Sequence, residues 1–474
     1  MPAFSDIPGE IARERLDVLV VGAGVLGSAL AVTLARQGRN VLLLERNLEE
    51  PNRIVGELLQ PGGVAALQQL GMGECLEEID AIPVEGYEIF YRGENIMFRY
   101  PLTDPVIKRR PQGRSFHHGR FIMKLREIAR NEKRVHVVEA TAKELLRCKE
   151  SKQVIGVMCS TRNQKEQTYF ADLTIVADGQ ASKFRCQYTK HTPITTSRFW
   201  ALELIDAVLP SHHIAYGVIG SGPPILIYQI GLHETRLLID IPSTVYEAAS
   251  RAHGIKHYVL TSVIPDLPAS VQPAATAALE KGGLRSMPNS WLPAAMNTTP
   301  GVAILGDAFN MRHPLTGGGM TVALNDVVLL RQLLGPEIIP TFSDTRLVVE
   351  QMSRFHWKRR GYSTSLNILA QALYTLFIAD DPQLQILQRG FIRYIQLGGK
   401  CVEEPAGLMG GVIRSPWLLF YHFLSVALYS LGILIREGYA LSVWHLIGAI
   451  FECFRVFAKA VVVIFPFLLS ELRS

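Results

Sequence analysis

LDVLVVGAGVLGSALAVTLARQGRNVLLLE, residues 16–45, is the stretch that decides the fold of this chain. The apolar run at residues 16–21 predicts a buried strand, residues 25–36 predict a helix that Gly38 terminates, and residues 41–44 predict a second strand. A strand, a helix and a second strand in this order form a βαβ unit. The sequence therefore predicts an α/β protein whose first sheet is parallel.

The turn between the first strand and the helix, GAGVLG at residues 22–27, is a dinucleotide-binding fingerprint. Gly22 permits the tight turn, Gly24 lets a pyrophosphate approach the backbone, and Gly27 lets the helix pack closely on the strand. The free N–H groups of the helix N-terminus favour the phosphates. Glu45, after the second strand, can accept hydrogen bonds from a ribose diol and would repel a 2′-phosphate. This pattern favours FAD or NAD over NADP.

Three later segments narrow the choice of dinucleotide to FAD. Residues 301–308, GVAILGDA, predict a strand ending at Asp307, whose carboxylate can bind a ribityl hydroxyl. In PLTGGGM, residues 314–320, three glycines including Gly319 bring the backbone close to a planar ligand before a helix at residues 321–334. The dipole of that helix stabilises negative charge at the flavin N1–C2=O edge. The third segment is a strand at residues 173–179 that ends in Asp178-Gly179. Together with the fingerprint, these three segments form the FAD signature of the aromatic-hydroxylase-like flavoproteins.

The middle of the chain is predicted to form strands of a second, antiparallel sheet. Residues 225–230 and 237–241 are β-rich runs on either side of a polar turn at residues 233–235, which predicts a hairpin in an antiparallel sheet. We expect this sheet to cover the flavin and to form the substrate cavity.

The expected domain organisation follows from these segments. It consists of an N-terminal segment (1–15), an FAD-binding domain (16–180) with interleaved substrate-domain strands around 81–118, a substrate-binding sheet domain (181–300), a second part of the FAD-binding domain (301–340), a helical region (341–414) and C-terminal membrane-associated helices (415–474).

The composition points away from nucleic acid and towards an apolar environment. The chain has 474 residues, of which 48% are hydrophobic and 19% charged, and its net charge of +5 is small for this length. Nucleic-acid-binding proteins usually carry a strong excess of basic residues, which this chain does not have. The six cysteines form no CxxC pair and fit neither a zinc site nor a disulfide scaffold. The adjacent pairs His117-His118 and His212-His213 rarely chelate together, so we expect no metal.

The C-terminal region carries much of the apolar excess. Residues 415–435 contain no Asp, Glu, Lys or Arg, Ser415 can cap a helix, and Pro416 fits its first turn. Such a helix is about 31 Å long, close to the hydrocarbon thickness of a bilayer. A membrane anchor is favoured over a pair of buried core helices. Charged residues between 452 and 459 favour partial or one-sided insertion, and the choice between a spanning and a monotopic arrangement stays open.

Longer motifs are more specific than the dinucleotide fingerprint. They are NRIVGELLQPGG at residues 52–63, FHHGRF at 116–121 and GDAFNMRHPLTGGGM at 306–320. From about residue 16 to the C-terminus the chain resembles the squalene monooxygenase (squalene epoxidase) family. The resemblance implies an FAD-dependent epoxidation of squalene to (S)-2,3-oxidosqualene with O2, through a flavin C4a-hydroperoxide, in sterol biosynthesis. It also implies electrons from NADPH–cytochrome reductase and an endoplasmic reticulum membrane location with the catalytic domain facing the cytosol.

The resemblance also implies site residues. Tyr87 matches a tyrosine of the family's active site, and Gln60 matches a polar residue near flavin and substrate. Position 58 holds Leu where the family pattern has Phe, a difference that we expect to affect packing more than chemistry. By family position the FAD contacts are Val25, Leu26, Glu45, Arg46, Arg53, Leu58, Arg126, Ala142, Asp307 and Met320, in addition to the fingerprint glycines Gly22, Gly24 and Gly27 and to Gly319.

Two other classes of protein share part of this pattern. A flavin monooxygenase that hydroxylates a polyprenylated aromatic ring would share the glycine and aspartate motifs, but not the long motifs or the apolar tail. A non-enzymatic lipid-binding module on a flavoprotein fold predicts a degraded FAD site, whereas this FAD signature is intact. A flavin spectrum and product analysis separate the three. Lys108-Arg109-Arg110 is interpreted as a solvated basic turn, with a docking patch for an acidic redox partner as the alternative.

Overall fold

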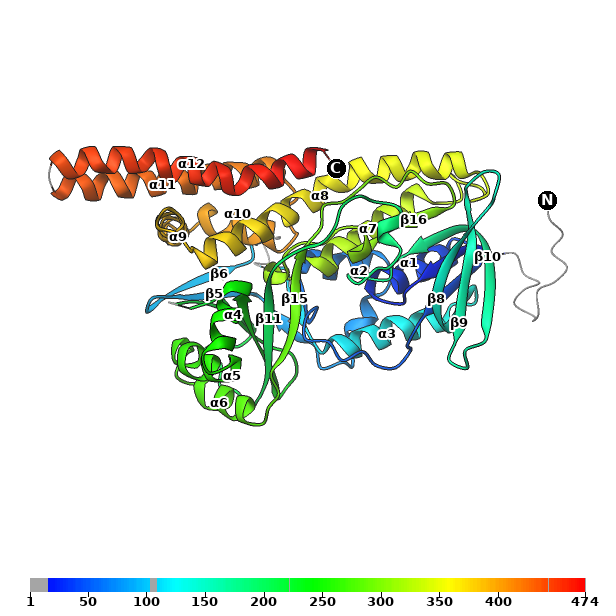
Figure 1. Ribbon diagram of the computed structural model, residues 1–474, viewed down its shortest axis with the longest axis horizontal. Helices are drawn as coiled ribbons and strands as arrows, with labels where there is room; N and C mark the ends of the chain where they lie inside the picture. Colours follow the sequence, from blue (N-terminus) through cyan, green and yellow to red (C-terminus); the bar gives the residue numbers. More distant parts are fainter. Residues whose placement is uncertain (1–15, 103–108, 221, 442, 474) are drawn as a thin grey trace.

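The computed structural model describes residues 16–102, 109–220, 222–441 and 443–473 (Figure 1). The expected N-terminal segment 1–15 and Lys108 of the basic turn lie outside the described residues. Figure 1 shows three parts: a nucleotide-binding body around a parallel sheet, a second sheet with small helices beside it, and a layer of long helices along one face of both.

The predicted βαβ unit is confirmed. It consists of β1 (Leu16–Val21), α1 (Val25–Arg36) and β2 (Val41–Glu45). A parallel sheet forms around it in the order β8-β2-β1-β10-β16, with β8 (Val135–Arg147), β10 (Glu166–Val176) and β16 (Val302–Ile304). Beyond this sheet β8 and β10 pair antiparallel with β9 (Val154–Thr161). The central strands are buried along most of their length and therefore form nearly continuous apolar runs, as is usual in parallel sheets.

Helices and short strands complete this body. α3 (His118–Asn131) and α7 (Gly319–Leu333) pack against α1, and α2 (Pro61–Gln69) packs against α7. α7 begins two residues before the predicted helix, inside the glycine segment. A three-stranded sheet of β3 (Leu58–Leu59), β7 (Gly113–Ser115) and β4 (Ile82–Val84) lies between the body and the second large sheet.

The second sheet has seven strands. Their order is β15 (Arg285–Trp291), β11 (Ile194–Ile205), β14 (Glu234–Pro242), β13 (Ile225–Gln229), β12 (Ile214–Ile219), β5 (Gly86–Tyr91) and β6 (Glu94–Arg99). All neighbours are antiparallel except β12 and β5. The predicted hairpin is confirmed, but the predicted turn is placed too late. Glu234 and Thr235 belong to β14, because the Glu234 carbonyl already accepts from the backbone N–H of Ile230 at 2.8 Å.

Short helices cover one face of this sheet, namely α4 (Ser243–Arg251), α5 (Ile255–Tyr258) and α6 (Gln272–Glu280). Their apolar side chains and those of the strands form a core separate from that of the nucleotide-binding body. The opposite face of the sheet is therefore left to face the body and the cavity described below.

Five helices form the last layer: α8 (Thr345–Ile378), α9 (Pro382–Ile395), α10 (Lys400–Met409), α11 (Pro416–Leu441) and α12 (Val443–Arg473). Ser415 caps α11 as predicted, since its Oγ accepts from the backbone N–H of Leu418 at 3.2 Å. α11 and α12 run antiparallel, and α12 returns along α8 so that the C-terminus ends beside that helix (Figure 1). Both are long and apolar enough to cross a membrane, and only 22% and 17% of their apolar windows are buried.

Candidate functional site

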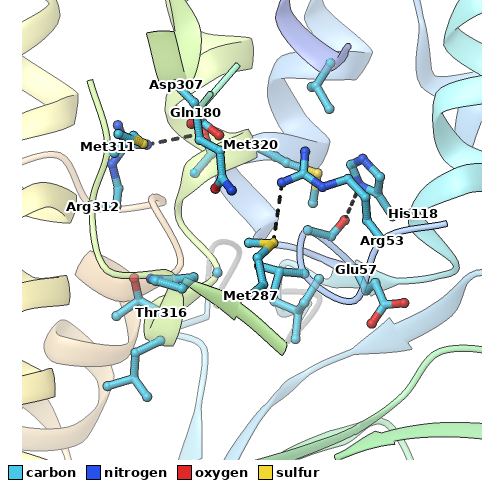
Figure 2. Close-up of a pocket in the computed structure, with 18 of the residues that line it drawn as sticks. Arg53, Glu57, His118, Gln180, Met287, Asp307, Met311, Arg312, Thr316 and Met320 are labelled. Atoms are coloured by element: carbon cyan, nitrogen blue, oxygen red, sulfur yellow. Dashed lines mark hydrogen bonds between the residues drawn. The ribbon is translucent and has the colours of Figure 1, made fainter. Parts of the chain in front are cut away.

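A cavity lies where the nucleotide-binding body meets the seven-stranded sheet. Four segments of the body line it, together with His118 of α3: the turn into α1, the loop at residues 53–58, residues 177–180 after β10 and the stretch from 307 to 323. The sheet contributes side chains of β5, β12, β13, β14 and β15. Figure 2 shows polar and sulfur-bearing side chains from these segments pointing into a shared space.

The turn into α1 has the geometry that the fingerprint predicts. Gly22 has φ +104°, which favours glycine, and a Cβ at Gly27 would lie 1.9 Å from the Gly22 carbonyl oxygen. A Cβ at Gly24 would meet no protein atom within 4 Å, because Gly24 faces the cavity. Val25 and Leu26 follow it in the cavity wall, and α1 has no side-chain cap. Its first N–H groups are therefore available to an anionic ligand.

Glu45 and Arg126 brace this turn from behind. The Glu45 carboxylate accepts from the Ala23 backbone N–H at 2.8 Å and lies 3.6 Å from the Arg126 guanidinium. Arg126 is buried and donates to the Ala23 carbonyl at 3.0 Å. Neither residue lines the cavity, and the same holds for the exposed Arg46 and for Ala142, which packs in the core on β8.

The loop at residues 53–58 forms another wall. Arg53 and Leu58 line the cavity, and Arg53 approaches Met287 of β15 across it, with 3.8 Å between Nη2 and Sδ (Figure 2). His118, at the start of α3, donates through Nδ1 to the Gly56 carbonyl at 2.8 Å. Burial, helped by the nearby Arg53, lowers the pKa of His118 to about 4, so the imidazole is neutral at physiological pH.

A buried ion pair ties the same loop to the sheet. Arg236 of β14 donates to both oxygens of Glu57, at 2.7 and 2.9 Å, and each residue is less than 5% exposed. Desolvation raises the pKa of Glu57, and its bond to Arg236 opposes that shift. The pair fixes the loop against β14, although the two residues are 179 positions apart.

The stretch from 307 to 320 closes the cavity on the side of α7. Asp307, Gly319 and Met320 line it, and Gly317 turns the chain with φ +62°. α7 begins at Gly319 without a side-chain cap, so its positive end faces the cavity. The Thr316 hydroxyl is buried in the wall without a hydrogen-bond partner among the described residues. Open glycines, two free helix N-termini and an unpartnered hydroxyl fit the adenine-dinucleotide and flavin ends of FAD.

Gln60 and Tyr87 meet at the edge of the cavity, where Tyr87 lines the wall and Gln60 lies buried behind it. The fully buried Gln60 amide donates to the Tyr87 hydroxyl oxygen and to the Thr316 carbonyl, the latter at 2.5 Å. Tyr100 donates to Gln60 Oε1 at 2.7 Å, and its oxygen lies 3.1 Å from that of Tyr87. Burial raises the pKa of Tyr87 to about 12. The structure thus brings both predicted catalytic residues together with the segment before α7.

Sequence reasoning missed several residues of the wall. Arg312 lines the cavity and donates to the Gly319 carbonyl at 3.3 Å. It lies inside the 306–320 motif, so its place in that motif could have identified it as a site residue. Glu57 lies inside the 52–63 motif in the same way. Tyr100 and the β15 residues Met287, Pro288 and Ser290 lie in no motif, and only the folded chain shows their positions.

Comparisons with known proteins agree with this geometry. Residues 170–447 match the squalene epoxidase family, and residues 17–53 match the FAD dependent oxidoreductase family. The squalene epoxidase of Aspergillus fumigatus is 56% identical, covering 97% of this chain and 95% of its own. The squalene epoxidase of Saccharomyces cerevisiae is 37% identical, with 96% of each chain covered.

Solved structures share the fold at low identity. A flavoprotein/dehydrogenase from Cytophaga hutchinsonii aligns with a TM-score of 0.67 and 15% identity, covering 88% of this chain and 100% of that one. A flavin-dependent brominase aligns with a TM-score of 0.66 and 14% identity, covering 88% and 99%. A probable FAD-dependent monooxygenase from Pseudomonas aeruginosa aligns with a TM-score of 0.59 and 19% identity, covering 85% and 100%.

Proposed function

The chain belongs to the squalene epoxidase family and is an FAD-dependent enzyme that epoxidises squalene with O2 in sterol biosynthesis, and we propose that FAD and squalene meet in the cavity described above, with Gln60 and Tyr87 at its reacting end. The observation that carries this proposal is the Gln60 amide, which joins the Tyr87 hydroxyl to the Thr316 carbonyl beside α7. It links a polar group of the sheet side to the segment that would hold the flavin.

Each part of FAD has a matching segment of the chain. The start of α1 at Gly24, Val25 and Leu26 would hold the pyrophosphate, and Asp307 would hold the ribityl chain. Gly319 and Met320 would hold the flavin edge, with the α7 N-terminus next to it. Glu45 and Arg126 act on this site by bracing the turn at Ala23. Bound and reduced FAD would activate O2, so that one oxygen atom of O2 is transferred to the alkene and the other leaves as water, with the two electrons coming from NADPH through NADPH–cytochrome reductase.

The remaining task of the chain is to exclude water and to place one end of a hydrocarbon. The sheet side of the cavity has an apolar wall formed by Ala215, Leu226, Leu238 and Met287. An alkene has no proton to be removed, so the site needs no general base. Tyr87 is kept protonated by its raised pKa, and its hydroxyl proton is free to turn towards an acceptor in the cavity. We assign it the role of orienting the flavin edge.

Replacing Tyr87 by Phe removes this hydroxyl and keeps the ring. We expect the epoxidation rate to fall about tenfold, which corresponds to the loss of one hydrogen bond of roughly 1.4 kcal/mol, with FAD affinity changed by less than about threefold. The measurement is oxidosqualene formed per bound flavin. Tyr169→Phe, which removes an exposed hydroxyl bonded to Gln167 on β10, is the matched control. Full activity of Tyr87→Phe would remove Tyr87 from the mechanism.

The exposed apolar side chains of α11 and α12 are consistent with membrane association. Trp417 is 83% exposed, Phe451 69% and Phe454 72%, and large apolar surfaces of this kind favour contact with lipid over water. Two charged residues of α12 turn towards the body, where Lys459 pairs with Asp381 and Glu452 accepts from Gln383, while Arg455 stays 69% exposed. We propose that the pair of helices lies in one leaflet of the endoplasmic reticulum membrane. The catalytic part would face the cytosol and receive electrons from NADPH–cytochrome reductase.

The double variant Phe451→Glu, Phe454→Glu tests whether the exposed apolar side chains of α12 contact lipid. Burying a Phe side chain contributes roughly 1.5–3 kcal/mol, so we expect binding to anionic vesicles to weaken by at least about 100-fold. The measurement is co-flotation with vesicles. Leu232→Glu changes an equally exposed leucine in the turn between β13 and β14 and should leave co-flotation unchanged. Equal loss in both variants would show that this part of α12 is not the lipid contact.

A further inference from the structure

A cluster of buried charges lies behind the α7 side of the cavity. It contains two cations, Arg312 and Arg359, and two anions, Asp326 and Glu471, all less than 10% exposed. Asp326 is paired directly with Arg359, at 3.0 Å. Glu471 is the other anion, and it comes from the last turn of α12, more than 100 residues away from the rest.

Arg312 connects this cluster to the cavity. It lines the cavity and donates to the Gly319 carbonyl at 3.3 Å, in the first turn of α7 (Figure 2). Its other hydrogen bonds go to Asn310 and, through Nε at 2.7 Å, to Asn367 Oδ1. Among the described residues no carboxylate accepts a hydrogen bond from Arg312, and the negative charges that act on it without direct contact are those of Asp307, Asp326 and Glu471. Burial lowers its pKa to about 10, so it stays charged at neutral pH.

Glu471 completes the chain of contacts. Its Oε1 accepts from Asn367 Nδ2 at 2.8 Å, and its Oε2 accepts from the Thr364 hydroxyl at 2.9 Å. Asn367 and Thr364 both belong to α8. The Asn367 amide is therefore polarised between an anion and a cation, with its oxygen on Arg312 and its nitrogen on Glu471. An uncompensated buried charge costs several kcal/mol, so the position of each member depends on the others.

We infer that Glu471 is a positioning residue for FAD: among the residues that the structure describes, the last turn of α12 supplies the one negative charge that reaches Arg312 through a hydrogen-bonded side chain, Asn367, and this connection holds Arg312 against the Gly319 carbonyl at the start of α7. The helix that carries the exposed apolar surface thereby also supports the flavin end of the cavity. Because coupling between two sites is reciprocal, seating of α12 on α8 and binding of FAD strengthen each other.

The test is FAD affinity of the detergent-solubilised full chain. We expect Glu471→Gln to raise the FAD dissociation constant at least about fivefold, measured by flavin fluorescence, and to shift the flavin absorption spectrum. Glu437→Gln is the matched control. It removes an anion from α11 that pairs with Arg389 at 2.7 Å on the surface, and it should leave both readouts unchanged.

Moving the charge to a neighbouring position distinguishes an electrostatic role of Glu471 from a role in packing alone. In Glu471→Gln, Asn367→Asp the carboxylate moves to position 367, next to Arg312, and the amide introduced at position 471 can donate to it. We expect the double variant to recover most of the lost FAD affinity. If Glu471→Gln fails to fold, recovery of folding by the double variant supports the inference, and failure of both variants contradicts it.

Two results would overturn the inference: a wild-type dissociation constant in Glu471→Gln, or a loss that Asn367→Asp does not repair. The inference rests on the proposed placement of FAD, which Gly24→Val tests separately. Normal FAD binding by Gly24→Val would show that the cofactor site itself is wrong, whereas normal binding by Glu471→Gln alone rejects only the role of Glu471.

Discussion

Gly24→Val is expected to weaken FAD binding about 100-fold while the protein still folds. A Cβ at Gly24 meets no protein atom within 4 Å, and the residue has φ −84°, which any residue can adopt. The side chain of valine would instead fill the space in which the pyrophosphate approaches the backbone. Overpacking of up to about 3 kcal/mol predicts a loss of FAD affinity of about 100-fold. Flavin content after purification and the FAD dissociation constant are the measurements.

Two other glycine variants are controls that separate an effect on FAD binding from an effect on folding. At Gly27 an added Cβ would lie 1.9 Å from the Gly22 carbonyl oxygen, so Gly27→Ala should lower the melting temperature of the apoprotein as well. Gly361→Ala, on α8, adds a methyl group where no neighbour lies within 4 Å, so it should leave FAD binding unchanged and raise stability by about 0.5–1 kcal/mol through helix propensity. If Gly24→Val lost FAD only together with its fold, the turn would be a structural element and not a cofactor contact.

Arg236→Leu is expected to destabilise the fold by about 3–5 kcal/mol, because it leaves the buried Glu57 carboxylate without its partner. Urea unfolding of the apoprotein measures the change. The double variant Arg236→Leu, Glu57→Leu removes both charges and should recover most of the stability. Arg251→Leu, which breaks an exposed pair with Glu247, should cost less than about 0.5 kcal/mol. A cost equally small for Arg236→Leu would mean that the pair does not fix the loop at residues 53–58.

The pH dependence of Arg236→Leu has a defined sign. Burial already raises the pKa of Glu57 while Arg236 opposes the shift, so removal of Arg236 raises that pKa further. The unfolded chain then releases the Glu57 proton at lower pH than the folded chain. Stability therefore falls as the pH rises from the unfolded pKa of about 4.3 through the folded pKa, and the penalty should be smaller near pH 5 than near pH 7.

Local patterns were enough to predict the nucleotide-binding unit. β1 and α1 have the predicted bounds because their signals lie within the segment: an apolar run, a glycine turn and a helix ended near Gly38. The hairpin of β13 and β14 was also predicted, but its turn was misplaced because polar side chains at Glu234 and Thr235 resemble a turn although their backbone is paired. Ser415 and Pro416 marked the start of α11 correctly.

Long-range contacts explain what the sequence could not predict. Gln60 contacts Thr316 across 256 positions and Glu57 contacts Arg236 across 179, and no periodic pattern links such partners. Tyr100 and Met287 enter the site only through strand order. For Arg46, Arg126 and Ala142 the family position implied a cofactor contact, and their places outside the cavity wall leave that role a proposal.

The most direct test of the central claim, that one cavity holds FAD and places squalene against it, is product analysis with purified protein, FAD, squalene, O2, NADPH and NADPH–cytochrome reductase. We predict 2,3-oxidosqualene from the wild-type chain, about tenfold less per flavin from Tyr87→Phe, and strongly reduced product from Gly24→Val when FAD is held near the wild-type dissociation constant. Absence of oxidosqualene from wild-type protein with bound FAD and active reductase would contradict the account, and so would undiminished product from Gly24→Val.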